Sequence, residues 1–167
     1  MKKADPKTNA MRALETAHIA YEPRYYDPEL TEELLTLGET IASAVGLPRE
    51  RVFKTLVGRG DKNGINVFCI PVCSELDMKR AAAVSGNKKF DLLAVKELLP
   101  ATGYIRGGCS PIGMRKKYPV YIEASALGYE TVTVSAGIRG CQLELAPKDL
   151  FVITGARAAP DITREKT

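Results

Sequence analysis

RVFKTLVGRGDKNGINVFCIPV, residues 51–72, contains the strongest structural signal in the chain. Its two apolar runs, 51–58 and 65–72, are rich in Val, Ile and Phe, which favour β-strands. The residues between them, Gly60-Asp61-Lys62-Asn63-Gly64, have the composition of a hairpin turn, because Gly and Asn tolerate a positive φ. The stretch therefore predicts an antiparallel β-hairpin.

Lys54 interrupts the first of these apolar runs. Because side chains alternate across a strand, Lys54 projects on the same face as Val52 and Leu56. An ammonium group on an apolar face costs free energy unless it is paired or reaches water. Two interpretations follow. The lysine either extends from an edge strand into solvent, or is held in a cleft where it binds a phosphate or carbonyl oxygen.

The segments on either side of the hairpin alternate between helical and strand patterns without a regular βαβ order. Helices are predicted over residues 8–19, 30–45, 77–85, 94–99 and 147–153, and further strands over 21–26, 104–106, 120–123, 131–135 and 141–145. This mixture predicts the α+β class with a mixed sheet. A chain of 167 residues suits a single domain, 1–167. Its core is expected over residues 9–154, and its apolar-poor tail, 155–167, is expected to fray.

Composition restricts the classes of protein to which the chain can belong. No apolar run approaches the roughly 20 residues that span a bilayer, and the basic start MKKADP lacks the apolar core of a signal peptide. We therefore expect a cytoplasmic protein with no membrane partner. Four cysteines and one histidine show no metal-ligand spacing, which predicts reduced structural thiols, no metal and no cofactor. The net charge of +4 only weakly indicates a polyanionic partner.

Two short motifs downstream combine glycine with polar residues. GGCSPIG, residues 107–113, has little side-chain bulk, so its backbone can approach a ligand and direct N–H groups at an oxyanion. A simple turn would use the same residues. Ser135, in Ser135-Ala136-Gly137, either binds a substrate or ends its strand. With no histidine nearby in sequence to activate this serine, the chain offers a lysine, backbone donors and a serine, but no general base.

Taken together and in this order, the three motifs resemble the YbaK/EbsC family of aminoacyl-tRNA deacylases. The matching stretches are VFKTL (52–56), GY (103–104) with GGCSPIG (107–113), and VSAG (134–137) with RG (139–140). The resemblance covers residues 9–153. It implies a mixed, mostly antiparallel sheet curled into a partial barrel with helices outside. It also implies a free-standing enzyme that clears Cys-tRNA(Pro), which prolyl-tRNA synthetase makes by mischarging.

The resemblance further implies roles for individual residues. Lys54 matches the family's essential lysine and is the expected catalytic residue. The expected substrate-binding positions are Tyr26, Thr55, Gly107, Gly108, Ser135 and Gly137. In the mechanism that the resemblance implies, the thiol of the mischarged cysteine attacks its own ester carbonyl. The protein then mainly orients the substrate and stabilises charge.

Gln142 departs from the family pattern, since some relatives carry an acidic residue two positions beyond the Arg-Gly pair. This leaves the subgroup open, and with it removal of alanine from tRNA(Pro) as an alternative. The second alternative is a non-catalytic module that binds tRNA or a synthetase. The expected partners are aminoacyl-tRNA, above all Cys-tRNA(Pro), and prolyl-tRNA synthetase in a transient complex. The basic triplet Arg115, Lys116 and Lys117 is either a tRNA contact or a solvated surface run.

Overall fold

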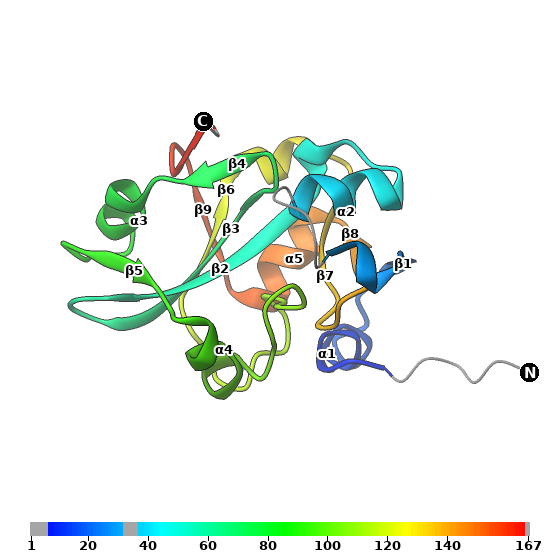
Figure 1. Ribbon diagram of the computed structural model, residues 1–167, viewed down its shortest axis with the longest axis horizontal. Helices are drawn as coiled ribbons and strands as arrows, with labels where there is room; N and C mark the ends of the chain where they lie inside the picture. The colour runs from blue at the N-terminus through cyan, green and yellow to red at the C-terminus, as the bar shows by residue number, and fades with distance from the viewer. Residues whose placement is uncertain (1–6, 32–36, 166–167) are drawn as a thin grey trace, which may run out of the picture.

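The computed structural model describes residues 7–31 and 37–165 and confirms the α+β class (Figure 1). Its α-helices are α1 (Asn9–Thr16), α2 (Leu37–Val45), α3 (Met78–Val84), α4 (Val95–Thr102) and α5 (Pro147–Thr154), and its 3-10 helices are η1 (Pro28–Thr31), η2 (Arg49–Arg51) and η3 (Ala124–Gly128). Its strands are β1 (Glu22–Tyr25), β2 (Phe53–Gly60), β3 (Gly64–Pro71), β4 (Ser74–Leu76), β5 (Phe90–Leu92), β6 (Val120–Glu123), β7 (Val132–Ser135), β8 (Cys141–Leu145), β9 (Arg157–Ala159) and β10 (Thr163–Glu165). No described helix is long and apolar enough to cross a membrane.

The predicted hairpin forms the centre of the largest sheet, whose strand order is β5-β2-β3-β6-β9. β2 and β3 pair antiparallel from Phe53–Pro71 to Gly60–Gly64, with the turn where it was predicted. β6 and β9 then add in parallel, so the sheet is mixed. β5 pairs only with residues 58–60 of β2. Within this sheet, the half of β2 that contains Lys54 therefore has a partner strand on one side only.

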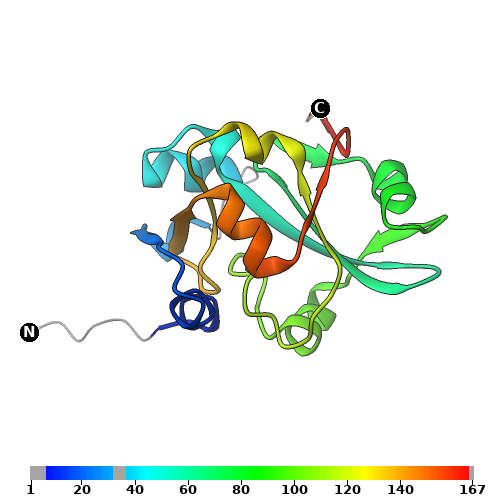
Figure 2. The same ribbon diagram turned by 180° about the vertical axis from the view of Figure 1, so that it is seen from behind.

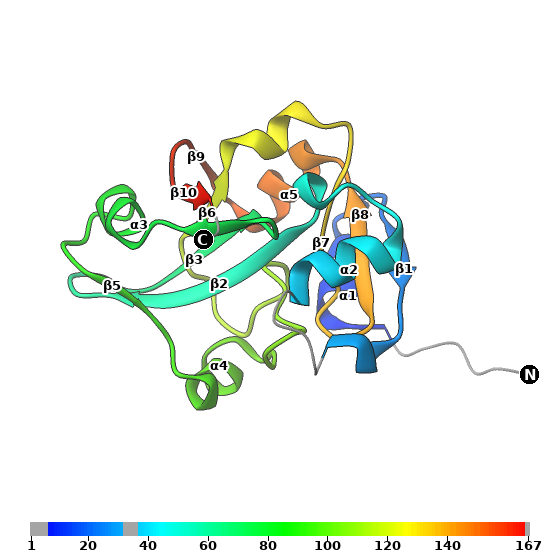
Figure 3. The same cartoon turned by 45° about the horizontal axis from the view of Figure 1, so that its top comes forward.

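The second sheet, β1-β8-β7, is antiparallel and has two contrasting faces. One face contributes Val132, Val134 and Leu143 to the main core, where α1 packs. The other face carries polar side chains, including Thr133 and Gln142, which are nevertheless buried. In Figure 3, α2 lies in front of this sheet and α1 behind it. The two faces are thus covered by different helices.

A backbone bridge joins the two sheets. Val52, just before β2, pairs with Thr133 of β7, and the two chain segments run parallel there. Beside the bridge, Ile41 and Ala42 of α2 pack against Val52 in a small apolar cluster. Figure 1 shows β2 running from the large sheet to the side of β7. This junction brings the lysine of one sheet close to the polar face of the other.

The tail that was expected to fray is ordered as far as residue 165. β9 pairs with β6, and β10 pairs with β4. Ala159 and Ile162 are buried beside Phe68 and supply the apolar anchors that the tail was expected to lack. In Figure 2 this segment continues from α5 and runs along β6 toward the C-terminus.

Three further expectations differ from the structure. The described strands are divided among three sheets, so a single sheet curled into a partial barrel is not confirmed. Residues 104–106 are not a strand, because Tyr104 turns into the core and its Oη donates to the Ile112 carbonyl at 2.6 Å. The helix expected to close at Pro100 continues to Thr102 and ends at Gly103, whose φ is +85°. Of the helix expected over 30–45, residues 30–31 belong to η1, residues 32–36 lie outside the described residues, and residues 37–45 form α2.

Candidate active site at the junction of two sheets

Lys54 lies in β2 at the open side of the large sheet and is half-buried. As predicted, it shares a strand face with Val52 and Leu56. Val52 belongs to the apolar cluster under α2, and Leu56 packs against a second cluster that includes Phe68, further along the same face of β2. The ammonium group is thus carried on a stem between two apolar clusters, which restricts the directions in which it can reach a polar partner.

Ser135 is brought level with Lys54 by the bridge between the sheets. Lys54 and Ser135 each lie two residues beyond the Val52–Thr133 pair in the same direction, so both project on the same side as that pair. Ser135 is 8% exposed, and its Oγ accepts a hydrogen bond from the N–H of Gly137 at 3.1 Å. Gly137 has a φ of +102°, which a residue with a side chain rarely adopts. The serine therefore closes a tight turn at the end of β7.

Tyr26 and Gln142 occupy the same polar face. Gln142 pairs with Ser135 across β7 and β8, and the N–H of Tyr26 continues the β1–β8 ladder to the Gly140 carbonyl at 2.9 Å. The Gln142 side chain is buried and accepts from Thr133 Oγ1 at 3.3 Å. Tyr26 Oη is buried and has no hydrogen-bond partner among the described residues. Burial raises the pKa of Tyr26, and the nearby Gly140 backbone and Gln142 amide oppose that rise.

The glycine loop packs directly on the turn that follows Ser135. A Cβ on Gly108 would lie 3.0 Å from the Ile138 backbone, and one on Gly107 would lie 2.9 Å from Arg139 Nε. The Arg139 side chain also donates to the carbonyl of Arg106 at 3.0 Å. The N–H of Gly108 already donates to the Ile105 carbonyl at 3.0 Å. Close packing, rather than an available Gly108 donor, thus accounts for the glycines here.

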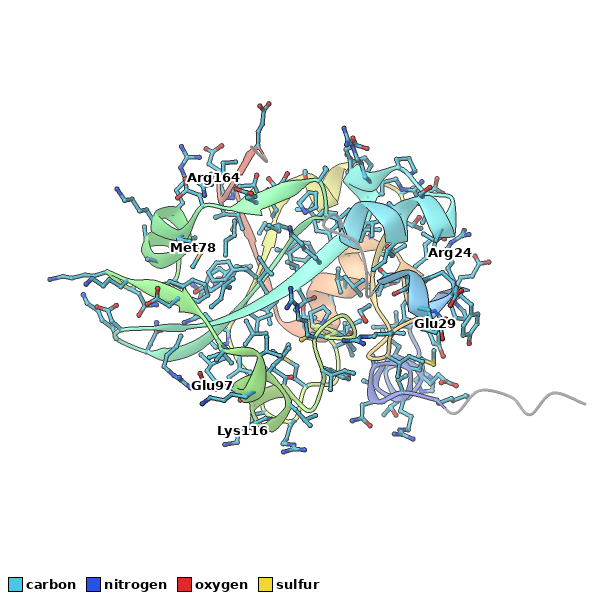
Figure 4. All side chains as sticks on the ribbon, viewed as in Figure 1. Arg24, Glu29, Met78, Glu97, Lys116 and Arg164 are labelled. Atoms are coloured by element: carbon cyan, nitrogen blue, oxygen red, sulfur yellow. The ribbon has the colours of Figure 1, made fainter. Side chains whose placement is uncertain are left out.

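Two sets of expected site residues lie elsewhere. Thr55 projects from the opposite face of β2, where its Oγ1 contacts Cys69 Sγ at 3.7 Å. The exposed triplet 115–117 lies against the end of α4, and its Arg115 N–H donates to the Thr102 carbonyl at 2.9 Å. Figure 4 shows Lys116 beside α4, well away from Arg24 on β1. The structure therefore places Lys54 level with Ser135 and packs the glycine loop on the turn that contains Gly137, but places neither Thr55 nor the triplet on the polar face.

Two of the protein's four thiols, those of Cys69 and Cys109, are poorly suited to act as nucleophiles. The four cysteines, all within the described residues, form no disulfide, in agreement with the prediction of reduced thiols. Cys69 and Cys109 are buried, and burial raises the pKa of each to about 12. Since the thiolate is the reactive form, both remain protonated at neutral pH.

Glu144 is a polar-face residue that the sequence reasoning did not single out. It follows Gln142 by two positions in β8 and bonds to Arg24, Arg51 and Thr131. Burial alone would raise the pKa of Glu144, but the Thr131 hydroxyl and the two guanidinium groups outweigh it and lower that pKa. The alternation of Gln142 and Glu144 with Cys141, Leu143 and Leu145 could have indicated a strand with one polar face.

Comparisons with known proteins show which family the chain resembles over most of its length. A family model described as the aminoacyl-tRNA editing domain matches residues 31–152. A protein of Enterococcus faecalis (strain ATCC 700802 / V583) named "Putative Cys-tRNA(Pro)/Cys-tRNA(Cys) deacylase EbsC" is 45% identical over 164 residues, 98% of each chain. "Uncharacterized protein YwhH" of Bacillus subtilis (strain 168) is 27% identical over 127 residues, covering 76% of this chain and 80% of that protein.

A solved structure extends the likeness to the fold. The crystal structure of "a putative trans-editing enzyme for prolyl tRNA synthetase" superposes with a TM-score of 0.79 at 25% identity, covering 95% of this chain and 96% of that one. The family model spans most of the chain, and the enterococcal protein matches nearly all of it. The chain therefore belongs to the aminoacyl-tRNA editing domain family, the YbaK/EbsC family.

Proposed function

We propose that this protein is a trans-editing deacylase that removes cysteine from mischarged Cys-tRNA(Pro). The names of the enterococcal relative and of the superposed structure support this substrate class. The observation that carries the proposal is the position of Lys54, half-buried and level with Ser135 beside a polar sheet face. The chain would act as a single domain in the cytoplasm, where tRNA is charged, and would receive its substrate from prolyl-tRNA synthetase.

The proposed chemistry uses the thiol of the substrate. Its sulfur attacks the ester carbonyl, a C–S bond forms, and the C–O bond to the terminal ribose breaks. The proton lost by the thiol ends on the ribose oxygen, so the products are tRNA with a free hydroxyl and a cyclic thiolactone. Attack within one molecule gains strongly from proximity and needs no nucleophile from the protein.

The protein's part in this reaction is to orient the ester and to stabilise charge. The Lys54 ammonium would face the carbonyl oxygen as negative charge develops on it. Tyr26 Oη has an unused hydrogen-bonding capacity and, with Ser135, would hold the aminoacyl group. Gln142 offers a neutral amide where some relatives have an acid, so any role of that position here does not involve a carboxylate.

The test is a deacylation assay with Cys-tRNA(Pro), Ala-tRNA(Pro) and Cys-tRNA(Cys), measured side by side, and Ser-tRNA as the hydroxyl analogue. We expect both cysteinyl-tRNAs to be cleared, since the attacking thiol is common to them, while alanyl- and seryl-tRNA persist. Clearance of Ala-tRNA(Pro) at the same rate as Cys-tRNA(Pro) would overturn the cysteine assignment. It would favour the alanine-removing alternative, in which water must be the nucleophile.

A further inference from the structure

The polar face of the three-stranded sheet continues from Gln142 to an ion-pair cluster centred on Glu144. The Glu144 side chain is only 11% exposed. Its Oε1 accepts from Arg24 Nε at 2.5 Å, and its Oε2 accepts from Arg51 Nη2 at 3.2 Å and from the Thr131 hydroxyl. Charge-assisted bonds of this kind are stronger and more directional than neutral ones. One carboxylate thus holds three side chains in place.

These three partners do not come from the same part of the molecule. Arg24 lies on β1, and Thr131 directly precedes β7, so both belong to the three-stranded sheet. Arg51 ends η2 and directly precedes Val52, the residue that bridges to β7. Arg51 Nε also donates to the Thr131 carbonyl at 2.9 Å. Of the two arginines on Glu144, Arg51 is therefore the one that crosses from the strand of Lys54 to the sheet of Ser135.

The distance along β2 makes this contact relevant to the site. Lys54 follows Arg51 by three residues, roughly 10 Å along an extended chain. Beyond Val52 the bridge to β7 is not continued as a ladder among the described strands. The relative placement of Lys54 and Ser135 thus depends on how firmly the start of β2 is tied to β7. Arg51 and Glu144 form such a tie.

We propose that Arg51 and Glu144 are positioning residues, which set the separation between Lys54 and Ser135. The inference rests on the proposed deacylase function. A misplacement of about 1 Å in a catalytic constellation can lower a rate by about 100-fold. Since neither residue lies at the reacting atoms, their loss acts through the placement of Lys54 and lowers kcat much more than it raises KM.

The decisive experiment compares Arg51→Gln with Arg24→Gln. Each substitution removes one guanidinium from the same carboxylate, but only the first cuts the link between the sheets. We expect Arg51→Gln to lower kcat for Cys-tRNA(Pro) about 10- to 100-fold with KM within about twofold of the wild type. Arg24→Gln should keep kcat within about twofold, although it lowers the melting temperature to a similar extent.

Two further variants keep the test independent of folding. Arg51→Lys keeps the charge but loses the planar fork that places one nitrogen on Glu144 and another on the Thr131 carbonyl, so an intermediate kcat is expected. Glu144→Gln retains an acceptor without the charge, and its kcat should lie between those of the wild type and Arg51→Gln. All rates are measured at temperatures where circular dichroism shows the variant folded.

The possible failures are distinguishable. If the wild type clears none of the aminoacyl-tRNAs, the proposed function fails. If the wild type is active and Arg51→Gln has the kcat of Arg24→Gln, only the positioning role fails. A loss of kcat that follows the melting temperature across all four variants overturns the positioning role as well, because it would show a purely structural cluster.

Discussion

Two groups of buried polar side chains lie at opposite ends of the β2–β3 hairpin, and they use their hydrogen bonds differently. At the turn end, Asn87 Oδ1 accepts from the N–H groups of Lys62 and Asn63 at 2.9 and 3.3 Å. Its Nδ2 donates to Asn63 Oδ1 at 2.9 Å and to Ser85 Oγ at 3.0 Å. At the Lys54 end, the buried hydroxyl of Tyr26 has no partner.

This difference separates a structural cluster from a candidate ligand site. An unsatisfied buried polar group costs about 1–3 kcal/mol, so a fold that keeps one retains a capacity that a ligand can use. The turn cluster has little such capacity left, apart from Asn66 Oδ1 at its margin, which is also without a partner. Burial of polar groups is therefore a weaker sign of function than burial combined with unused hydrogen bonds and a nearby charge.

Of the substitutions that test this difference, Lys54→Ala, at the Lys54 end of the hairpin, should have the largest effect on activity. We expect kcat/KM for Cys-tRNA(Pro) to fall about 100- to 1,000-fold, since a group that stabilises developing charge contributes about 3–4 kcal/mol. Thermal unfolding should change little. The matched control is Lys62→Ala at the turn end, an exposed lysine whose loss should affect neither quantity. If the protein is only a tRNA-binding module, Lys54→Ala will instead produce a salt-sensitive loss of affinity and no loss of catalysis.

Asn87→Ala should produce the reverse pattern at the turn end. It leaves two backbone N–H groups without their acceptor, so the free energy of unfolding should fall by about 1–3 kcal/mol. The kcat of the folded variant should equal that of the wild type. Urea unfolding measures the free energy of unfolding, and a deacylation assay measures kcat. Loss of activity with unchanged stability would mean that the turn cluster is not merely structural. Asn87→Asp keeps the acceptor and loses the donors. Its free energy of unfolding should lie between those of the wild type and Asn87→Ala.

Tyr26→Phe tests the same difference between two tyrosine hydroxyls, one without a hydrogen-bond partner among the described residues and one with a partner. Because its hydroxyl has no partner to lose, stability should not decrease, whereas deacylation should slow by about tenfold, the equivalent of about 1.4 kcal/mol. The matched control is Tyr104→Phe. The Tyr104 hydroxyl donates to the Ile112 carbonyl at 2.6 Å, so its removal should cost about 1 kcal/mol of stability with little change in rate. Destabilisation by Tyr26→Phe would show that its hydroxyl is already used.

Lys116→Ala should have the smallest effect, because Lys116 lies beside α4 and away from Arg24 of the three-stranded sheet (Figure 4). If Lys116 contacts a tRNA phosphate, the slope of log affinity against log salt should fall by at most about 1. The kcat should not change. Binding titrations at several salt concentrations check this prediction. A change in kcat would place the triplet nearer to the chemistry than the structure does.

Features encoded in local pattern were predictable from the sequence. The hairpin, its turn, the bounds of β8 and the proline start of α5 follow from alternation and turn chemistry within a few neighbouring residues. The three-residue strands β4, β5, β9 and β10 were not predicted, because strands so short exist only through the partners that they pair with. Ile162 shows the point: its burial depends on Phe68, far away in sequence.

The candidate site could be predicted only in part, for the same reason. Lys54 stands out by itself, since a charge in an apolar run is a local anomaly. The Glu144–Arg51 pair joins residues 93 positions apart, and nothing local identifies it. Thr55 was expected to bind substrate because it matches a substrate-pocket position in the family resemblance, and the structure places it on the face of β2 opposite Lys54. Adjacent residues of a strand project to opposite faces, and Thr55 accordingly meets Cys69 instead.

The burial of the cysteines has a consequence for a protein that would handle thiol substrates. Burial raises the pKa of Cys69 and of Cys109 to about 12, so both thiols stay protonated at pH 7. Acyl transfer from a cysteinyl ester or a thiolactone to the protein requires the thiolate, as does mixed-disulfide formation with free cysteine. Burial therefore protects Cys69 and Cys109 from covalent capture by the reactive groups of the substrate and product proposed for this protein.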